Sequence, residues 1–421
     1  MTKKAKTILI SVISVLVIAL SFFSGYLTRE LVMDEDARSA MYLIENYKKH
    51  YYFEEDNIVD VISSTVLDKY STYYSREEYE LVQRSAKGYT DGIGLVFKEK
   101  SSVIEEVLGN SPSQLAGITA GGEVVAYNVG KGFISPINYT DTLNAVRLLK
   151  SGERITLKIL YGSVEKVFDL TKREYLRTYV KYKSNSGTYA YQGDNDIKRV
   201  KITEASPTFS QKTAYIKYSS FNGKNNGLYG SAGQIENALE FFKQEGKENL
   251  IFDLRGNGGG YLDIMNKVAS YIVPSKNGQE QLTLYSKDKH GVVTKYYSEK
   301  SRFEDFGIKK LIVMLDENSA SASEALTGAM HDYAIEYGLD FKIVISSSNK
   351  DNQTVYKSYG KGIMQTTYKN PDGSAVKLTS AKLFWPKTNI CIHNVGITSQ
   401  ISDIIVNAEK QSALNYAISL C

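Results

Sequence analysis

The chain has 421 residues, including 51 Lys or Arg and 47 Asp or Glu, a net charge of +4, and 42% of its residues are hydrophobic. This composition is typical of a globular protein, and so small a net charge argues against a broad basic surface for nucleic acid. The four histidines and two cysteines show neither CxxC nor HExxH spacing, so we expect no protein-built metal site and no cofactor. Whether Cys391 and Cys421 form a disulfide stays open.

An uncharged segment near the N-terminus is predicted to cross a membrane. The run from Thr7 to Thr28 follows three lysines, and as a helix of about 22 residues it would reach roughly 33 Å. Basic residues before such a segment favour a cytoplasmic N-terminus. We therefore expect a signal anchor over residues 1–30, a single pass through the cell membrane and an extracytoplasmic remainder. The alternative is a cleaved signal peptide.

Four further regions follow along the chain. Residues 31–87 carry apolar side chains at helical spacing, which predicts a helical region, either a small bundle or a dimerisation element. Residues 88–172 contain short strands and turns. Residues 181–212 are rich in Ser, Asn, Asp, Gly and Lys, which is typical of a linker or an exposed insertion. After Thr213, apolar strands alternate with long helices, as in an α/β domain.

The segment 88–172 resembles a PDZ domain, a module that binds peptide tails. The resemblance rests on Gly92, Ile93 and Gly94, followed by a Ser-Pro pair at 111–112 and an Ala-Gly-Ile turn at 116–118. In such a module the backbone N–H groups of the glycine loop hold the terminal carboxylate of a peptide. The turn is followed by Gly-Gly-Glu where the Gly-Asp pair is usual.

A glycine-rich loop follows the apolar strand 249–254. It reads RGNGGG over residues 255–260 and precedes a predicted helix over 261–272. A dinucleotide fingerprint would require glycine at Tyr261, and no P-loop Lys-Ser/Thr follows. A plain tight turn is one interpretation. The other is a cluster of N–H donors beside a helix N-terminus, which suits an anion or a short-lived oxyanion.

A serine cluster follows the strand 310–315. Residues 319–324 read SASASE and open a helix, so Ser321 and Glu324 can be interpreted as an ordinary capping box. A nucleophile at this position would also benefit from the N–H of the next residue. His331 is ten residues further along the same predicted helix, too far to act as its base. Lys361 is the better candidate, because flanking glycines let the chain carry a lysine into a packed site where desolvation disfavours the ammonium form.

Together these segments resemble the C-terminal processing peptidases, also called tail-specific proteases. Residues 253–260, 319–324 and 360–365 follow the order of that family's motifs, and the resemblance extends over about residues 38–405. It implies an α/β fold, with a ClpP/crotonase-like protease core over residues 173–421 and an inserted or preceding PDZ domain over 88–172.

The resemblance also implies the roles of individual residues. Ser321 is the expected nucleophile, Lys361 the general base and Gln365 the side chain that orients the lysine. The oxyanion hole would use the backbone N–H groups of Ala322 and of the glycine loop, with Gly259 preferred over Gly258. The expected protein is a serine endopeptidase that cleaves proteins near their C-terminal tails, a membrane protein with no nucleic-acid partner and, by resemblance, a homodimer.

Several departures and alternatives stay open. The 40 residues that separate Ser321 from Lys361 exceed the family's usual gap, and the polar excess around 346–357 is expected to form a surface loop. Ile363 replaces a usual threonine, and the Pro-Asp usual after residues 396–399 is missing. The second hypothesis is a catalytically degenerate scaffold that binds peptide tails. A third is a hydratase or hydrolase of acyl thioesters with a crotonase-like oxyanion pocket.

Overall fold

The chain divides into two compact units, Met1–Tyr73 and Tyr74–Cys421. The computed structural model describes the ranges 34–50, 58–98, 100–193, 196–203, 207–224, 226–350, 353–410 and 412–421. The first unit contains helices α2 (Glu35–His50) and α3 (Ile58–Val66), and strand β1 (Thr72–Tyr74) crosses the boundary. Within these ranges no helix combines the length and apolar character needed to cross a bilayer. The anchor predicted over 1–30 lies outside the described residues.

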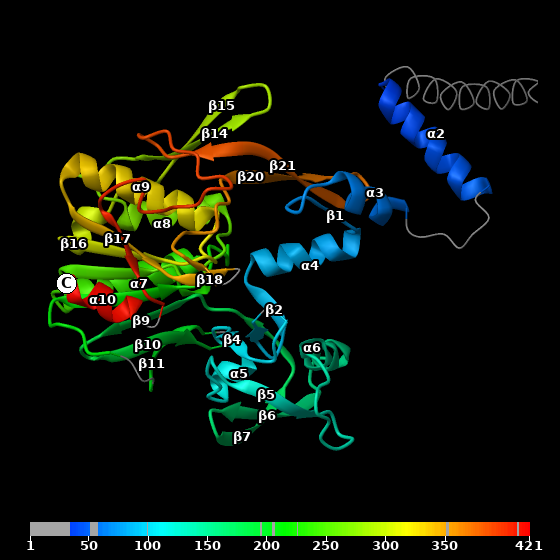
Figure 1. Ribbon diagram of the computed structural model, residues 1–421, viewed down its shortest axis with the longest axis horizontal. Helices are drawn as coiled ribbons and strands as arrows, with labels where there is room; N and C mark the ends of the chain where they lie inside the picture. The colour runs from blue at the N-terminus through cyan, green and yellow to red at the C-terminus, as the bar shows by residue number, and fades with distance from the viewer. Residues whose placement is uncertain are drawn as a thin grey trace, which may run out of the picture. The chain divides into compact units, whose positions relative to one another are not determined.

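An eight-stranded sheet forms the centre of the second unit (Figure 1). Its strands, in spatial order, are β11 (Lys198–Ile202), β10 (Gly187–Gln192), β9 (Val180–Ser184), β12 (Thr213–Tyr218), β13 (Asn249–Asp253), β16 (Lys310–Leu315), β17 (Asp340–Ser346) and β22 (Ile405–Ala408). The strands from β12 to β22 are parallel, and the three before them are antiparallel. Because parallel strands end at the same edge, the loops after β13 and β16 meet there.

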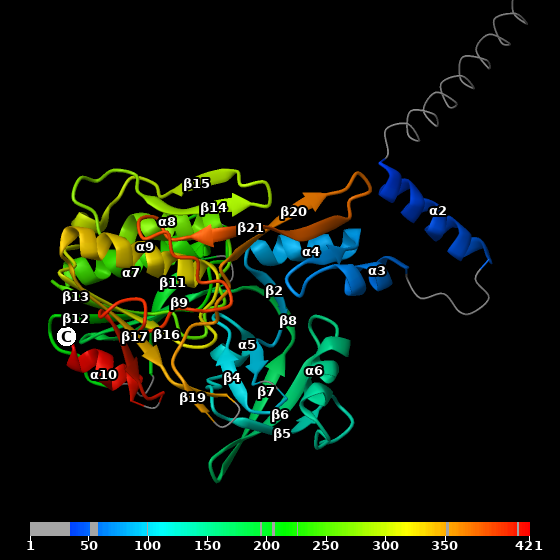
Figure 2. The same cartoon turned by 45° about the horizontal axis from the view of Figure 1, so that its top comes forward.

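Helices cover both faces of this sheet. Helices α7 (Ser231–Gln244), α8 (Leu262–Ile272) and α9 (Ala322–Tyr337) pack on one face, and α10 (Ala413–Ser419) packs on the other (Figure 2). Successive side chains of a strand point to opposite faces. Val313 accordingly lies in the core beneath the three helices, whereas Ile312 lies in the core beneath α10. Burial on both faces explains why β16 is apolar from Leu311 to Leu315.

The segment 181–212 was expected to be a linker or an exposed insertion, and this prediction is wrong. It forms most of β9 and all of β10 and β11 of the main sheet. Tyr182 and Tyr191 are completely buried, and the ring of Tyr182 packs edge-on against Phe242 of α7. In β9 lysines flank the buried Tyr182, and β11 carries Lys198, Arg199 and Lys201, so a composition dominated by polar residues conceals a buried face.

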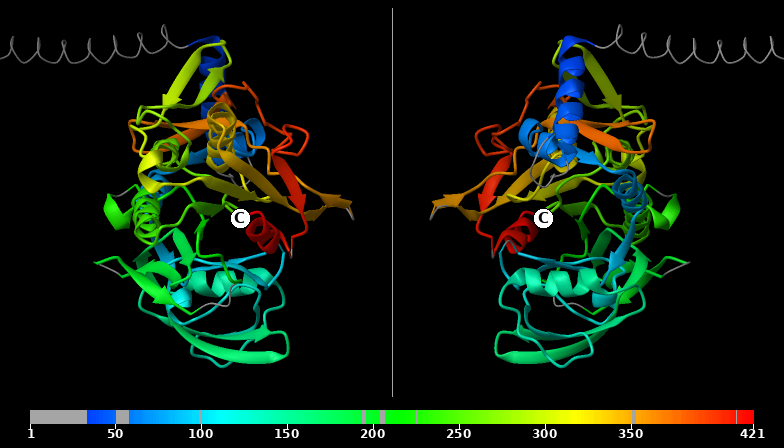
Figure 3. Two further views of the ribbon diagram at one scale, coloured as in Figure 1. Left: turned by 90° about the vertical axis from the view of Figure 1, so that its left-hand side faces the viewer. Right: turned by 90° about the vertical axis from the view of Figure 1, so that its right-hand side faces the viewer.

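A second, antiparallel sheet lies in the same unit. It contains β14 (Leu282–Asp288), β15 (Val293–Tyr297), β20 (Ile363–Lys369) and β21 (Ala375–Phe384). Strand β20 begins two residues after Lys361. The polar segment before β20 forms a separate hairpin of β18 (Ser348–Lys350) and β19 (Gln353–Val355). This hairpin is orange in Figure 3 and projects outward.

A smaller region with its own hydrophobic core precedes the main sheet. Its elements, after helix α4 (Arg76–Ala86), are β2 (Tyr89–Gly92), β3 (Leu95–Phe97), β4 (Ile104–Val107), α5 (Pro112–Leu115), β5 (Glu123–Asn128), α6 (Tyr139–Leu148), β6 (Arg154–Tyr161), β7 (Val164–Thr171) and β8 (Arg173–Leu176). Ile104, Leu157 and Ile159 are fully buried there. Two short 3-10 helices, η1 (Gly227–Tyr229) and η2 (Phe303–Phe306), lie in the loops of the main domain. The fold as a whole is mixed α/β, as expected.

Candidate active site

Ser321 occupies a strained turn between β16 and α9. Its backbone has φ of +57° and ψ of −114°, a combination that non-glycine residues rarely adopt. Such a conformation costs about 1–3 kcal/mol and persists only where neighbouring groups enforce it. Ser321 immediately precedes Ala322, whose N–H belongs to the first helical turn and has no intrahelical acceptor. The turn therefore presents a serine and a backbone donor side by side.

The carboxylate of Glu324 joins this turn to the segment that carries Lys361. Its Oε2 accepts the backbone N–H groups of Ser321 and of Lys361, each at 2.9 Å. Its Oε1 accepts the N–H of Gly360 at 2.8 Å and the hydroxyl of Ser358. Glu324 itself is completely buried. One side chain thus brings together two chain segments that lie far apart in the sequence.

Lys361 lies half-buried between two glycines that no larger residue could replace. Gly360 has a φ of +88°, and a Cβ there would lie 2.9 Å from the nitrogen of Gly396. A Cβ on Gly362 would lie 2.6 Å from the nitrogen of His393. Close backbone approach therefore explains both glycines.

Gln365 lies half-buried on β20, where it faces Thr379 of β21 in the strand register. Its amide nitrogen donates to the Thr379 hydroxyl at 3.3 Å. This hydrogen bond holds the side chain against β21. The role predicted for Gln365, orienting Lys361, stays a prediction.

The glycine-rich loop packs directly against Ser321. Gly259 is buried with a φ of +98°, and a Cβ there would lie 2.8 Å from Cβ of Ser321 and 2.9 Å from the nitrogen of Ala322. Its own N–H donates to Oδ1 of Asn257 at 2.9 Å. Gly258 is exposed, a Cβ there would meet no atom within 4 Å, and within the described ranges its N–H has no acceptor. The two glycines predicted as oxyanion donors therefore differ in availability.

We expect Gly259→Ala to destabilise the protein far more than Gly258→Ala. At position 259 the residue has a left-handed backbone, and the added methyl group would overlap backbone atoms of the turn at Ser321. That turn must therefore shift, which should lower the unfolding free energy by about 2–4 kcal/mol. At position 258 the methyl group points into open space, and the change should stay within about 0.5 kcal/mol. Urea denaturation of the three proteins measures the difference. Equal midpoints for both variants would refute the contact.

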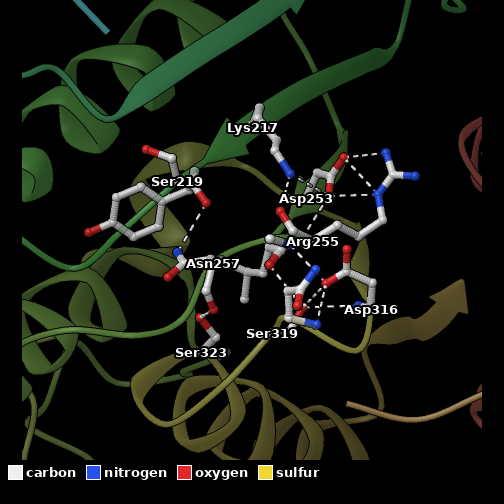
Figure 4. A network of polar contacts seen from close by, with 12 residues as sticks. Lys217, Ser219, Asp253, Arg255, Asn257, Asp316, Ser319 and Ser323 are labelled. Carbon is white, nitrogen blue, oxygen red and sulfur yellow. Dashed lines mark hydrogen bonds and ion pairs between the residues drawn. The ribbon is translucent and has the colours of Figure 1, made fainter. Parts of the chain in front are cut away.

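A buried ion-pair network fixes the start of the loop (Figure 4). Asp253 accepts the hydroxyl of Tyr215 at 2.8 Å, Nε of Arg255 at 2.9 Å and Nζ of Lys217 at 3.4 Å. Burial by itself would raise the pKa of Asp253, but the charges of Lys217 and Arg255 and the hydrogen bonds of Arg255 and Tyr215 hold it well below its ordinary value. In addition, Oδ1 of Asp316 accepts the N–H of Gly256 at 2.8 Å. The loop therefore starts from a rigid, charge-balanced anchor.

Asp253→Asn should lower the unfolding free energy by about 2–4 kcal/mol at pH 7, because it leaves the half-buried Lys217 and Arg255 without their buried counter-charge. A depressed folded-state pKa provides stability that is present above the ordinary aspartate pKa and lost as the pH falls toward the depressed one. The difference in unfolding free energy between the wild type and Asp253→Asn should therefore become smaller below about pH 4. Urea midpoints measured from pH 3 to pH 7 test this. A gap that does not change with pH would contradict the assignment.

His331 lies in α9, which runs without a break from Ala322 to Tyr337. Its Nδ1 is 2.9 Å from Oδ1 of Asp332, and its ring packs against Trp385 with centroids 5.1 Å apart. An unbroken helix places it about 15 Å along the axis from Ser321. This histidine supports the helix packing and is not a partner for the serine.

The predicted tail-binding loop lies in the smaller region. Gly92 ends β2, and the carbonyls of Ile93 and Gly94 accept the N–H groups of Ser113 and Leu108 at 3.0 and 2.9 Å. The loop is therefore held in place by its carbonyl groups. Across the described part of the chain no cluster of His, Cys, Asp or Glu is suited to a metal, and both cysteines are free thiols.

Sequence comparisons agree with these motifs. Residues 212–338 match the model of peptidase family S41, a range that contains the glycine-rich loop and Ser321. The chain is 27% identical over 384 residues to a "Probable CtpA-like serine protease" of Staphylococcus epidermidis, covering 89% of this chain and 66% of that protein. A protein of the same name from Staphylococcus saprophyticus is 29% identical over 343 residues, covering 81% and 58%. The chain thus spans just under two thirds of the length of these relatives.

A solved structure also aligns with the chain. It is a photosystem II D1 C-terminal processing protease, with a TM-score of 0.49, 19% identity and coverage of 87% of this chain and 86% of that one. The sequence matches indicate a serine-type peptidase similar to the C-terminal processing peptidases, with the model of peptidase family S41 matched over residues 212–338.

Proposed function

We propose that this protein is a serine endopeptidase that works through an acyl-enzyme on Ser321. The observation that carries the proposal is the single oxygen of Glu324 that binds the backbone N–H groups of both Ser321 and Lys361. In its neutral form Lys361 takes the hydroxyl proton of Ser321 as the oxygen attacks the scissile carbonyl. The C–N bond then breaks, and Lys361 gives the proton to the leaving amine. Water releases the acyl group by the same steps, and Gln365 orients the lysine.

The oxyanion of each tetrahedral intermediate would be held by backbone donors. Ala322 supplies the first, at the start of α9. The glycine-rich loop would supply the second: Gly259 packs against Ser321 and Ala322 with its N–H paired to Asn257, and the neighbouring Gly258 has an N–H without an acceptor in the described ranges. Donors that are free before the substrate arrives cost no reorganisation in the transition state.

The proposed substrate is the C-terminal tail of another protein. The region 88–172 is assigned as a PDZ domain whose loop at Gly92, Ile93 and Gly94 captures the terminal carboxylate. Its separate core and the positive φ angles of Gly92 and Gly94 support this assignment. The proposed organisation is an anchor over 1–30, a helical region over 31–87, this module, and a protease core over 173–421. The protein would act on the outer side of the cell membrane, as a homodimer.

Two peptides that differ only at the C-terminus test the proposal. One carries a free carboxylate and the other a C-terminal amide, and the full chain in detergent is assayed by mass spectrometry of the products. We expect Ser321-dependent cleavage of both, with kcat/KM at least about tenfold higher for the free acid, since the amide loses a charge-assisted hydrogen bond. Tail binding without any cleavage would instead support the degenerate scaffold. Equal cleavage of both peptides would show that the C-terminal carboxylate is not recognised, and would refute the proposed tail specificity.

A further inference from the structure

Lys172, between β7 and β8 of the smaller region, has a buried charged side chain that the proposed mechanism does not use. Only 9% of the side chain is exposed. Its Nζ donates to the carbonyl of Leu149 at 2.8 Å and to that of Val146 at 3.3 Å, both at the C-terminal end of α6. The same atom forms an ion pair with Oδ2 of Asp91 at 3.3 Å. The ammonium group therefore joins α6 to β2.

Helix capping alone explains only part of this arrangement. The last carbonyls of a helix have no intrahelical donor, and a cation is favourable beside them. A lysine that caps a helix from the surface would meet that need without leaving water. Burial of an ammonium is costly unless the charge is paired, and the charge that pairs Lys172 is on Asp91, in another element. The pair therefore serves the connection between α6 and β2, and not the helix end alone.

The strand register places this connection beside the loop proposed to capture tails. Strands β2 and β8 are antiparallel, and their last pair is Gly92 with Arg173. Lys172 directly precedes this pair on one strand, and Ile93 directly follows it on the other. Ile93 and Gly94 are buried, and within the described ranges their N–H groups have no acceptor. Buried donors without an acceptor are costly, and a peptide carboxylate would satisfy them.

We propose that Lys172 is a positioning residue for the capture of substrate tails. By tying Asp91, the residue before the loop, to the end of α6, it holds the loop at residues 92–94 in the arrangement that receives a terminal carboxylate. It does not touch that carboxylate, because its side chain is buried and its charge is already paired. The inference rests on the proposed tail recognition and adds a residue that should affect binding of the tail and not the chemistry at Ser321.

The test compares Lys172→Met with Lys150→Met in the full chain in detergent. Lys150 is exposed directly after α6, so its replacement removes the same charge near the same helix end. Each protein is assayed with two peptides of one sequence, one with a free C-terminal carboxylate and one with an amide. We expect Lys172→Met to lower kcat/KM about tenfold for the free acid and to leave it within about twofold for the amide, which does not use the carboxylate site. Lys150→Met should change neither value by more than about twofold.

Asp91→Asn provides the second variant if Lys172→Met does not fold. Asp91 is exposed, and the amide keeps its size but not its charge, so kcat/KM for the free acid should fall at least about threefold with no change for the amide peptide. An increase for the free acid would show instead that Asp91 competes with the tail for Lys172, and would overturn the positioning role.

Two further results would overturn the inference. One is a folded Lys172 or Asp91 variant with the wild-type ratio of kcat/KM between free acid and amide. The other is an equal loss for both peptides, which would indicate a purely structural role. If the wild type itself does not distinguish the two peptides, the proposed tail recognition fails, which is a different result from a selective wild type with an equally selective variant.

Discussion

Lys361→Ala is expected to lower kcat by about 10³- to 10⁴-fold, because the serine hydroxyl loses the group that takes its proton. KM should change little, since the amine has no role in holding the peptide. Within the wild type the rate should rise with pH, because only the neutral amine accepts a proton. Steady-state kinetics on a tail-bearing peptide measure both effects.

Two control variants separate base catalysis from loss of charge. Lys361→Arg keeps the positive charge but remains protonated at any working pH, so it should be as inactive as the alanine variant. Lys369→Ala removes an exposed lysine at the far end of β20 and should retain activity. Wild-type kcat in Lys361→Ala would eliminate the Ser–Lys mechanism.

Glu324→Gln is expected to have the second-largest effect. The carboxylate accepts four hydrogen bonds, and the amide that replaces it would direct one NH₂ group at N–H or hydroxyl donors. We expect a loss of about 2–4 kcal/mol of unfolding free energy and at least about 100-fold in kcat, because Ser321 and the segment of Lys361 lose their common support. Urea denaturation and peptide kinetics measure the two losses. Glu336→Gln, near the exposed end of the same helix, is the control and should change neither.

The pH dependence of the same residue gives an independent test. Burial raises the pKa of Glu324, against the opposing hydrogen bonds of Ser358, Gly360, Lys361 and Ser321. As the pH falls through that raised pKa, protonation replaces an acceptor by a donor, so activity should fall reversibly. A raised folded-state pKa also means that this group's contribution to stability decreases as the pH rises from the ordinary glutamate value to the raised one, and is constant above it. Acid inactivation at the same pH in wild type and Glu324→Gln would contradict this explanation.

The parallel strands of the core could be predicted from sequence, and the small antiparallel strands could not. Residues 250–252 and 311–315 are apolar at every position because both faces of these strands are covered, and uninterrupted apolar runs are easy to recognise. In β9 only every second side chain is buried, and lysines flank the buried Tyr182, whereas β10 mixes buried and half-buried residues without strict alternation. The alternation of apolar and polar residues in β9 was the available signal for a half-buried strand.

The local motifs identified Ser321 and Lys361, but the contacts between them could not be read from spacing. Glu324 was visible only as the second half of a capping box, because its other partners, Ser358 and Gly360, come from a segment after the β18–β19 hairpin. The choice between Gly258 and Gly259 likewise depends on where Asn257 points, which the order of residues in the loop does not reveal. A sequence pattern names residue types, whereas donor availability is a property of the folded backbone.

The most direct test of the whole account is covalent labelling of the full chain in detergent with a fluorophosphonate, followed by peptide mapping. The account predicts a single labelled site at Ser321, no labelling of Ser319 or Ser323, no adduct in Ser321→Ala, and much slower labelling in Lys361→Ala. Labelling at another serine, or an unchanged rate without the lysine, would contradict the assignment of Ser321 and Lys361 as nucleophile and base.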